Sequence, residues 1–212
     1  MATITISRQF GSHGDTVAQL LSERLGYRYF DKNLMTGLAV QVGLPIDQVV
    51  DISEERPRAR SLVERLFANF ASPVGDPGLW AASAATETQE QLAVAKLKYL
   101  IQAAHAEGNV VIIGRGGQAV LQNLPDVLHV RLVAPLELRI KRHGERAGLS
   151  PAEAREAVIQ HDHASIDYVR RFYDLDLTNP ELYDLIINTG RITPLAAARL
   201  IIEAVNQLPA NS

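Results

Sequence analysis

The chain has no cysteine and no excess of positive charge, and each absence removes classes of function. Without cysteine in its 212 residues, it has no disulfide framework, no thiolate nucleophile and no cysteine-ligated zinc or iron–sulfur site. Its 21 lysine and arginine residues against 24 aspartate and glutamate residues give a formal net charge of -3. That balance excludes a global basic field that would recruit nucleic acid or an acidic membrane.

Long hydrophobic runs are also missing. No stretch approaches the roughly 18 apolar residues of a membrane span, and the opening MATITISRQF has no apolar signal-peptide core. The hydrophobic fraction of 47% and the charged fraction of 21% are those of an ordinary globular protein with a substantial core. We therefore expect one cytoplasmic domain over residues 1–212, with no membrane or nucleic-acid partner.

Short apolar strands alternate with helical patterns along most of the chain. The first predicted strand, the loop after it, a helix from Asp15 and a second strand form a βαβ unit, which implies a parallel sheet. Five strands are predicted in all, at Ala2–Ser7, Tyr27–Phe30, Asn109–Ile113, Val127–Val133 and Asp184–Asn188. The pattern predicts a three-layer α/β/α fold with a five-stranded parallel sheet.

The segment from about 32 to 105 has almost no strand signal and is predicted to be a helical insertion. A breaker-rich stretch, Ala71–Gly78, interrupts it. The apolar residues Phe67, Phe70 and Trp80 flank this stretch. Two interpretations stay open for them, closure over a bound acceptor or packing against a second subunit of a homodimer.

A glycine-rich loop follows the first predicted strand and leads into a helix. Its residues Gly11, Ser12, His13, Gly14, Asp15 and Thr16 present backbone amides at a helix N-terminus, where an anion is favoured. The full phosphate-loop pattern G-x-x-x-x-G-K-[ST] is absent, because no lysine occurs between Arg8 and Lys32. The alternative interpretation is a tight turn with two convenient glycines.

Positive charge is concentrated in one later segment. Arg139, Arg142 and Arg146 fall within roughly 60° of one another on a helix. From Arg131 to Arg146 there are five lysine or arginine residues against two glutamates, a local excess of three charges. The segment is either a solvated helical face or a set of phosphate ligands, for which guanidinium groups are well suited.

Five short motifs rich in glycine, tyrosine or aspartate follow one another along the chain. They are Ile4–Ser12, Gly11–Ala18, Leu25–Asp31, Gly114–Gly117 and Tyr183–Thr189. In this order the sequence resembles the bacterial cytidylate kinases, and above all the cytidylate kinase-like group of that superfamily. The resemblance implies a P-loop nucleoside monophosphate kinase fold. It also implies transfer of the γ-phosphoryl group of ATP, with Mg²⁺, to a monophosphate such as CMP or dCMP.

The same resemblance implies roles for individual residues. Gly11 to Thr16 would hold the donor phosphates, with Asp15 and Thr16 near the metal. Asp31, Arg115 and Asp162 would hold the acceptor. The arginines Arg139, Arg142, Arg146 and Arg170 would close over the transferring phosphates from a lid at about 139–173. From the residues alone, Arg115 has the alternative role of a structural ion pair with Asp31 or Asp162.

Departures from the family pattern fall on the charged groups. The family's phosphate-binding lysine aligns with Gly14, its metal-binding serine or threonine aligns with Asp15, and an arginine three residues after Asp162 is replaced by Ser165. Electrostatic stabilisation is the main catalytic term in phosphoryl transfer. Three hypotheses therefore follow: an active kinase, a nucleotide-binding regulatory protein that has lost catalysis, and a P-loop fold that binds another anionic ligand.

Overall fold

The structure, a computed structural model, describes residues 2–30, 32–41 and 77–209. Its contacts divide the chain into two units, of which the first contains Met1–Phe30 and Ile101–Ser212 and the second contains Asp31–Leu100. The sheet and all the turns considered below belong to the first unit.

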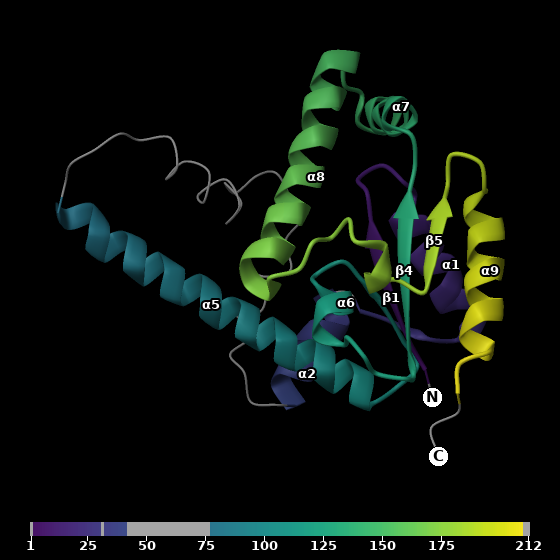
Figure 1. The fold of residues 1–212 in the computed structure, drawn as a ribbon, viewed down its shortest axis with the longest axis horizontal. Coiled ribbons are helices and arrows are strands. Elements are labelled where there is room, and N and C mark those ends of the chain that lie inside the picture. Colours follow the sequence, from purple (N-terminus) through teal and green to yellow (C-terminus); the bar gives the residue numbers. More distant parts are fainter. Residues whose placement is uncertain (1, 31, 42–76, 210–212) are drawn as a thin grey trace. The chain divides into compact units, whose positions relative to one another are not determined.

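Five parallel strands form the centre of the first unit, in the spatial order β2-β3-β1-β4-β5. Their bounds are β1 Thr3–Arg8, β2 Arg28–Tyr29, β3 Val110–Ile113, β4 Val127–Val133 and β5 Leu185–Asn188. The register pairs Ile6 with Ile113 on one side of β1 and with Val130 on the other. The predicted five-stranded parallel sheet is confirmed (Figure 1).

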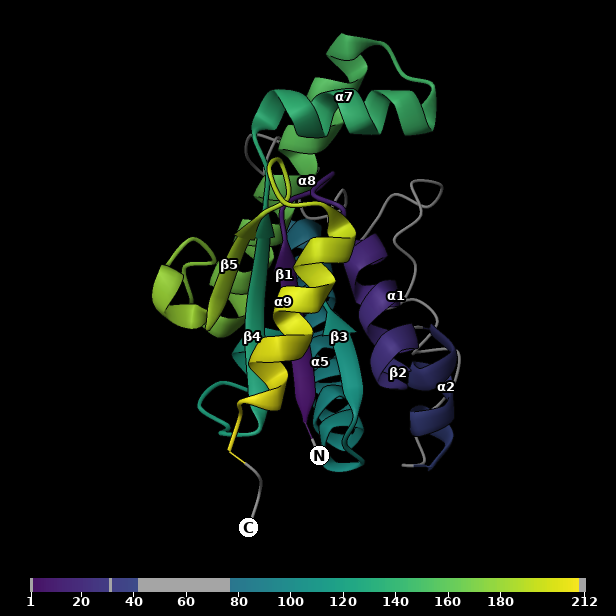
Figure 2. The same ribbon diagram turned by 90° about the vertical axis from the view of Figure 1, so that its right-hand side faces the viewer.

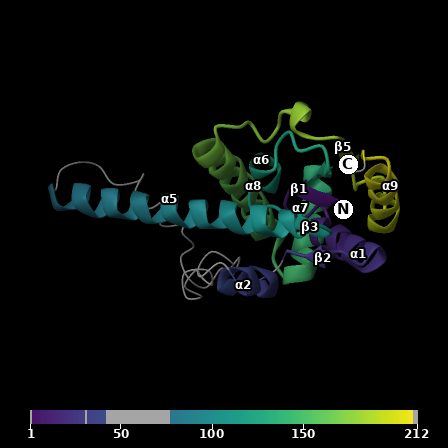
Figure 3. The same cartoon turned by 90° about the horizontal axis from the view of Figure 1, so that it is seen from below.

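Helices cover both faces of this sheet. The helices that lie wholly within this unit are α1 Gly14–Leu25, α6 Gly117–Val120, α7 Leu136–Ala147, α8 Pro151–Tyr173 and α9 Pro194–Asn206, with a 3-10 turn η1 at Pro180–Leu182. In Figure 3, α1 and α9 lie on one side of the strands, and α6 and α8 lie on the other. The three-layer prediction is therefore confirmed.

Local capping signals explain where two of these helices begin. The side chain of Ser150 accepts a bond from the Glu153 amide, and Glu153 reaches back to the Ser150 backbone, so the predicted capping box is present at the start of α8. At the start of α9, the Thr193 side chain accepts a bond from the Ala196 amide, ahead of Pro194 at the first helical position. The sequence pattern did not indicate α6, which is a four-residue helix.

The two faces of β1 differ in chemistry. Ile4 and Ile6 belong to an apolar cluster with residues of α1 and α9. The alternate residues Thr3, Thr5 and Ser7 are also buried, and each bonds a polar side chain, namely His105, His129 and Arg131. The buried hydroxyl groups of this face are thus each hydrogen-bonded, which lowers the cost of burying them.

The second unit contains two described helices, α2 (Lys32–Gln41) and the part of α5 (Pro77–Ala106) that ends at Leu100. The described residues of the predicted insertion are therefore helical. Phe67 and Phe70 lie outside the described residues, and Trp80 lies in α5. Within the part of the chain that the structure describes, no helix combines the length and apolarity needed to cross a membrane.

Candidate functional site

The carboxyl ends of four strands meet at one edge of the sheet, toward which β1 and β4 point in Figure 2. Hydrogen bonds tie these ends together. The Gln9 amide donates to the Leu132 carbonyl, the Gly114 amide to Ile6, and the Thr189 amide to Val133. In parallel α/β sheets, ligands bind at this edge. We name residues 9–14, which follow β1, turn 1, and residues 114–117, which follow β3, turn 2.

Turn 1 reverses the chain through two residues with left-handed backbone, Gly11 (φ 80°) and His13 (φ 61°). Ser12, which is fully buried, closes the turn because its amide and its hydroxyl both donate to the Gln9 carbonyl, at 3.2 and 2.7 Å. The helix α1 begins at Gly14. The first backbone N–H groups of a helix have no partner inside it, so those of Gly14, Asp15 and Thr16 are oriented for an external acceptor.

Asp15 and Thr16 are exposed at the start of α1. His13 is the N-cap of the helix, so Asp15 is not the capping residue. The Asp15 side chain lines a shallow groove along the helix with Gln19, Ser22, Glu23 and Tyr29. The donors available here are oxygens, which Mg²⁺ prefers, and no described group of three or more His, Asp or Glu residues forms a metal cage. This set fits a Mg²⁺ ion that is held partly by a ligand's phosphates.

The three arginines that share one face of α7 have different surroundings. Arg139 is only 4% exposed, and its guanidinium donates to the Ala134 and Phe10 carbonyls and to the Asp162 carboxylate, the last at 2.7 Å. Arg142 is half-buried and donates to the Thr189 carbonyl at 2.8 Å and to the Gly11 carbonyl at 3.5 Å. Arg146 is exposed. Arg139 is therefore engaged within the protein, whereas Arg146 faces solvent.

Arg139 and Asp162 together hold the backbone of Phe10, and we name this pair the Phe10 clamp. Asp162 accepts the Phe10 amide at 2.9 Å, while Arg139 donates to the carbonyl of the same residue at 3.1 Å. The Phe10 ring stacks on His161 with centroids 4.1 Å apart and meets His143 edge-on at 4.8 Å. The α7–α8 hairpin is thus bonded directly to turn 1.

Two histidines near this contact titrate below their usual range. Burial is the main cause of the lowered pKa of His13, and the positive charges of Arg142 and Arg146 lower it further. Burial also lowers the pKa of His143, helped by Arg146 and His161. The surroundings of turn 1 are therefore positive, in a chain with a net negative charge.

Turn 2 carries Arg115, which has a left-handed backbone (φ 56°) that bulky residues rarely adopt. Its guanidinium lies 5.8 Å from the centroid of the Phe30 ring. The alternative partner Asp162 bonds Arg139 instead. Gly116 has φ 71°, and a Cβ atom there would lie 2.7 Å from the Tyr173 ring. Strained, closely packed backbone of this kind is common at functional sites.

One residue that the sequence analysis did not assign, Arg8, extends between the two turns. A Cβ atom on Gly14 would lie 2.7 Å from the Arg8 Cγ, and a Cβ atom on Gly114 would overlap the Arg8 guanidinium. The stem of Arg8 therefore passes the start of α1, and its charged end reaches turn 2. The sequence signal that could have indicated Arg8 is its position, six residues before Gly14, where the phosphate-loop pattern has its first glycine.

Two further predicted site residues have different outcomes in the structure, and one supporting residue was not predicted. Arg170 is exposed in the last turn of α8. Asp31 lies outside the described residues. Thr189, which the sequence analysis gave no role, is buried, and its hydroxyl donates to the Ser12 carbonyl at 2.9 Å, so it supports turn 1 from the end of β5.

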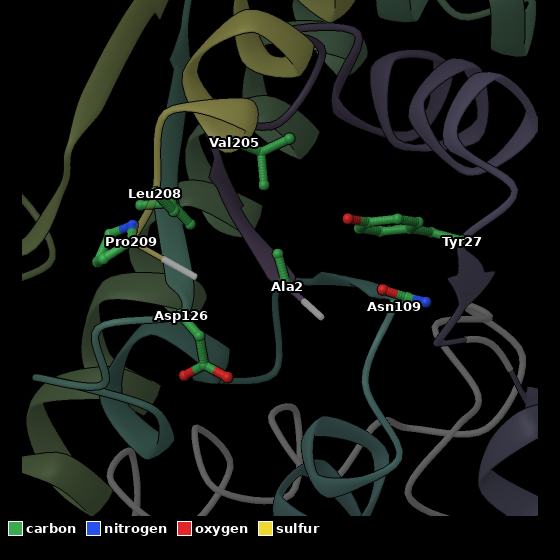
Figure 4. A pocket seen from close by; sticks show the side chains of 7 residues that line it. All are labelled: Ala2, Tyr27, Asn109, Asp126, Val205, Leu208 and Pro209. Atoms are coloured by element: carbon green, nitrogen blue, oxygen red, sulfur yellow. The ribbon is translucent and has the colours of Figure 1, made fainter. Parts of the chain in front are cut away.

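A depression lies at the other end of the strands (Figure 4). It is lined by Ala2, Tyr27, Asn109, Asp126, Val205, Leu208 and Pro209. Ala2 precedes β1, Asn109 precedes β3 and Asp126 precedes β4, so this depression is at the amino-end edge of the sheet. It contains none of the predicted site residues.

Comparison with known proteins identifies the family. The model of the cytidylate kinase-like family matches residues 3–191. The chain belongs to the cytidylate kinase-like family. This confirms the resemblance inferred from the motifs, and the match includes both turns, the Phe10 clamp and the arginines of α7.

Two relatives of this cytidylate kinase-like chain match over nearly their full length. A cytidylate kinase of Ignicoccus hospitalis is 26% identical over 202 residues, covering 95% of this chain and 97% of the relative. A cytidylate kinase of Archaeoglobus fulgidus is 26% identical over 203 residues, covering 95% and 93%. Among solved structures, an uncharacterised protein of Eubacterium ventriosum has a TM-score of 0.68 at 19% identity, covering 98% of this chain and 99% of that one. That structure shares the fold.

Proposed function

We propose that this chain is a kinase that transfers the γ-phosphoryl group of ATP to a nucleoside monophosphate of the cytidylate type. The observation that carries the proposal is the convergence of turn 1, turn 2 and Arg142 at the carboxyl edge of the sheet. Membership of the cytidylate kinase-like family supports the same activity. An acceptor phosphate oxygen attacks the γ-phosphorus as the bond to the β–γ bridging oxygen breaks, which yields a nucleoside diphosphate and ADP.

The donor phosphates lie at turn 1, against the amides of Gly11 to Thr16. Arg115 in turn 2 holds the acceptor, and the resemblance to the family implies the same role for Asp31, which lies outside the described residues. Arg142, Arg146 and Arg170 neutralise the charge of the transferring group, because phosphoryl transfer depends on alignment and on electrostatic stabilisation. Arg139 and Asp162, which bond each other and Phe10, position turn 1.

Asp15 and Thr16 are the oxygen donors nearest to the donor phosphates. Mg²⁺ held there would neutralise part of the phosphate charge. Without the ion, the exposed Asp15 carboxylate would repel a phosphate. We therefore expect nucleoside triphosphate binding to depend strongly on Mg²⁺.

A ligand panel tests the proposal. ATP, CMP, dCMP, UMP and AMP, each with and without Mg²⁺, are compared for the rise in melting temperature that a ligand of the folded state produces. ADP release from ATP is then measured by a coupled assay with each monophosphate. We expect ATP with Mg²⁺ to stabilise the protein, and CMP or dCMP to give the fastest ADP release.

One observation favours a second function, that of a nucleotide-binding regulatory protein. The position of the family's lysine is Gly14, and a carboxylate, Asp15, follows it. If ATP with Mg²⁺ stabilises the protein but no monophosphate yields ADP, the regulatory function replaces the kinase. If no nucleotide changes the melting temperature, both proposals fail and another anionic ligand must be sought.

The role of Arg115 can be tested separately from folding. Asparagine tolerates left-handed backbone better than arginine does, so Arg115→Asn should leave the unfolding free energy unchanged or raise it. Turnover should fall by about a hundred-fold or more, since one phosphate-stabilising group is lost. Asp174→Asn, at a left-handed position at the end of α8, is the matched control and should keep full turnover. Equal activity of Arg115→Asn and the parent would exclude Arg115 from the acceptor site.

A further inference from the structure

Relative to the usual phosphate-loop pattern, this chain has a glycine at the position of the lysine and an arginine at the position of the first glycine. In the pattern G-x-x-x-x-G-K-[ST], the first glycine stands six positions before the lysine. With the lysine position at Gly14, the first-glycine position is Arg8, and the second is His13. His13 has the left-handed backbone that a glycine would adopt readily at that position. The backbone requirement of the pattern is therefore met, while the cation comes from the other end of the loop.

The geometry of Arg8 agrees with this exchange. Its stem fills the space in which a side chain at position 14 would begin, since a Cβ atom there would lie 2.7 Å from the Arg8 Cγ and 3.0 Å from its Cβ. At distances this short one of the two groups must move, and both of the atoms in the way belong to the stem of the Arg8 side chain. Gly14 is itself buried. A lysine at position 14 and an arginine at position 8 are thus mutually exclusive in this arrangement.

The far end of Arg8 lies where two parts of the site approach each other. The guanidinium occupies the space beside the Gly114 Cα, at the carboxyl end of β3 and one residue before Arg115. Gly114 has φ 65° and could accept a larger residue only with strain and with displacement of this group. Arg8 thus presents a fixed positive charge between the start of α1, which bears the donor amides, and turn 2, which bears Arg115.

We propose that Arg8 is the phosphate-binding cation that replaces the missing loop lysine, and that glycine occupies positions 14 and 114 to let its side chain through. The inference rests on the proposed function, because the phosphates it contacts are those of the ATP donor. The chain therefore retains the positive charge that its altered loop has lost at position 14. A guanidinium also offers several donors to phosphate oxygens, where an ammonium offers a point charge.

The test combines a binding readout with a turnover readout. The parent is compared with four variants: Arg8→Gln, Arg8→Lys, Gly14→Lys and the exchange variant, which combines Arg8→Gly with Gly14→Lys. Arg24→Gln, which changes an exposed arginine in the last turn of α1, is the control. Binding is measured as the rise in melting temperature caused by inorganic tripolyphosphate with Mg²⁺, and turnover as CMP-dependent ADP release. Circular dichroism without ligand establishes that each variant is folded.

We expect Arg8→Gln to lose the tripolyphosphate shift and about a hundred- to a thousand-fold in turnover, as when one stabilising group is removed. Arg8→Lys should retain part of both, and Arg24→Gln all of both. Gly14→Lys alone should be inactive, because the two cations compete for one space. The exchange variant should recover turnover relative to Arg8→Gln.

The outcomes separate the inference from the proposed function. Unchanged turnover in folded Arg8→Gln would overturn the inference and leave the kinase intact. A tripolyphosphate shift that depends on Arg8, in a parent that releases no ADP, would uphold the inference and overturn the kinase. Absence of both signals in the parent would overturn both. If Arg8→Gln does not fold, the exchange variant decides: recovery upholds the inference, and failure to bind or to fold assigns Arg8 to packing alone.

Discussion

Turn 1 and turn 2 have the same backbone design but are held in place by different forces. In each turn, the residue that precedes the helix is left-handed and makes no side-chain cap, His13 before α1 and Gly116 before α6. The helix α8 contacts both. In its middle, Asp162 completes the Phe10 clamp on turn 1, and at its end the Tyr173 ring lies against Gly116 in turn 2. The contact of α8 with turn 1 is thus made by charge and hydrogen bonds, and its contact with turn 2 by close packing.

This difference indicates which changes each turn tolerates. Charge-assisted bonds weaken when one partner is lost or when pH alters the neighbouring charges. Packing against a glycine weakens only when atoms are added or removed. Variants of the two turns should therefore respond to different perturbations, although both turns belong to one proposed site.

The largest effect is expected from adding one methyl group to turn 2. Gly116→Ala introduces left-handed strain of about 1–2 kcal/mol, and overlap with Tyr173 adds about 1–3 kcal/mol. Gly148→Ala at the end of α7 is the control, because φ is 67° and nothing lies within 4 Å of its Cβ position. Urea unfolding should show a larger loss for Gly116→Ala. If the two variants lose the same free energy of unfolding, the Tyr173 ring can move aside without cost and packing does not hold turn 2.

Removal of the Phe10 clamp should destabilise turn 1 by a comparable but smaller amount. Arg139→Met leaves the Asp162 carboxylate without its charged partner, and a bond to a charged group contributes about 1.5–3 kcal/mol. Arg155→Met breaks the exposed pair between Arg155 and Glu137 in the same hairpin and should cost at most about 1 kcal/mol. Unfolding free energies measure both. If Arg155→Met costs as much as Arg139→Met, the clamp has no special role.

Acidification should affect turn 1 and leave turn 2 unchanged. The pKa of His13 is lowered on folding, so below its ordinary value of 6.5 the unfolded chain binds a proton that the folded chain resists. The unfolding free energy should therefore fall as pH drops through 6.5, by well under about 1.4 kcal/mol per pH unit, since solvent screens these groups. Burial raises the pKa of Tyr173, which keeps it neutral in this range.

The measurement is urea unfolding between pH 7.5 and 5.5. His13→Asn preserves the left-handed backbone and removes the titrating group, so it should flatten the dependence. His143→Asn should flatten it further. His129, whose pKa is also lowered by burial, leaves a residual slope. If the unfolding free energy of the double variant, His13→Asn with His143→Asn, depends on pH as steeply as that of the parent, the charge near turn 1 has no influence on folding.

The same contrast explains what could be predicted from the sequence. The strands and the helices α8 and α9 follow from local signals, such as the apolar run at Val110–Ile113 and the capping box at Ser150. Periodicity also places Arg139, Arg142 and Arg146 on one face. It does not say that Arg139 is buried, because its partners Asp162 and Phe10 are 23 and 129 residues away. The path of Arg8 likewise depends on Gly114, which only the folded sheet brings near.

The smallest effect, and the most informative about the proposed ligand, is expected at Asp15. A carboxylate in the first turn of a helix contributes about 0.3–1 kcal/mol, so Asp15→Asn should lower stability by that amount. Glu23→Gln is the control, since Glu23 lines the same groove two turns farther from turn 1. In the absence of Mg²⁺, Asp15→Asn should strengthen tripolyphosphate binding by removing repulsion. In its presence, the gain should vanish or reverse, because the ion has lost a ligand. A gain that is equal with and without Mg²⁺ would exclude Asp15 from the metal site, and Asp15→Lys should then strengthen ATP binding further.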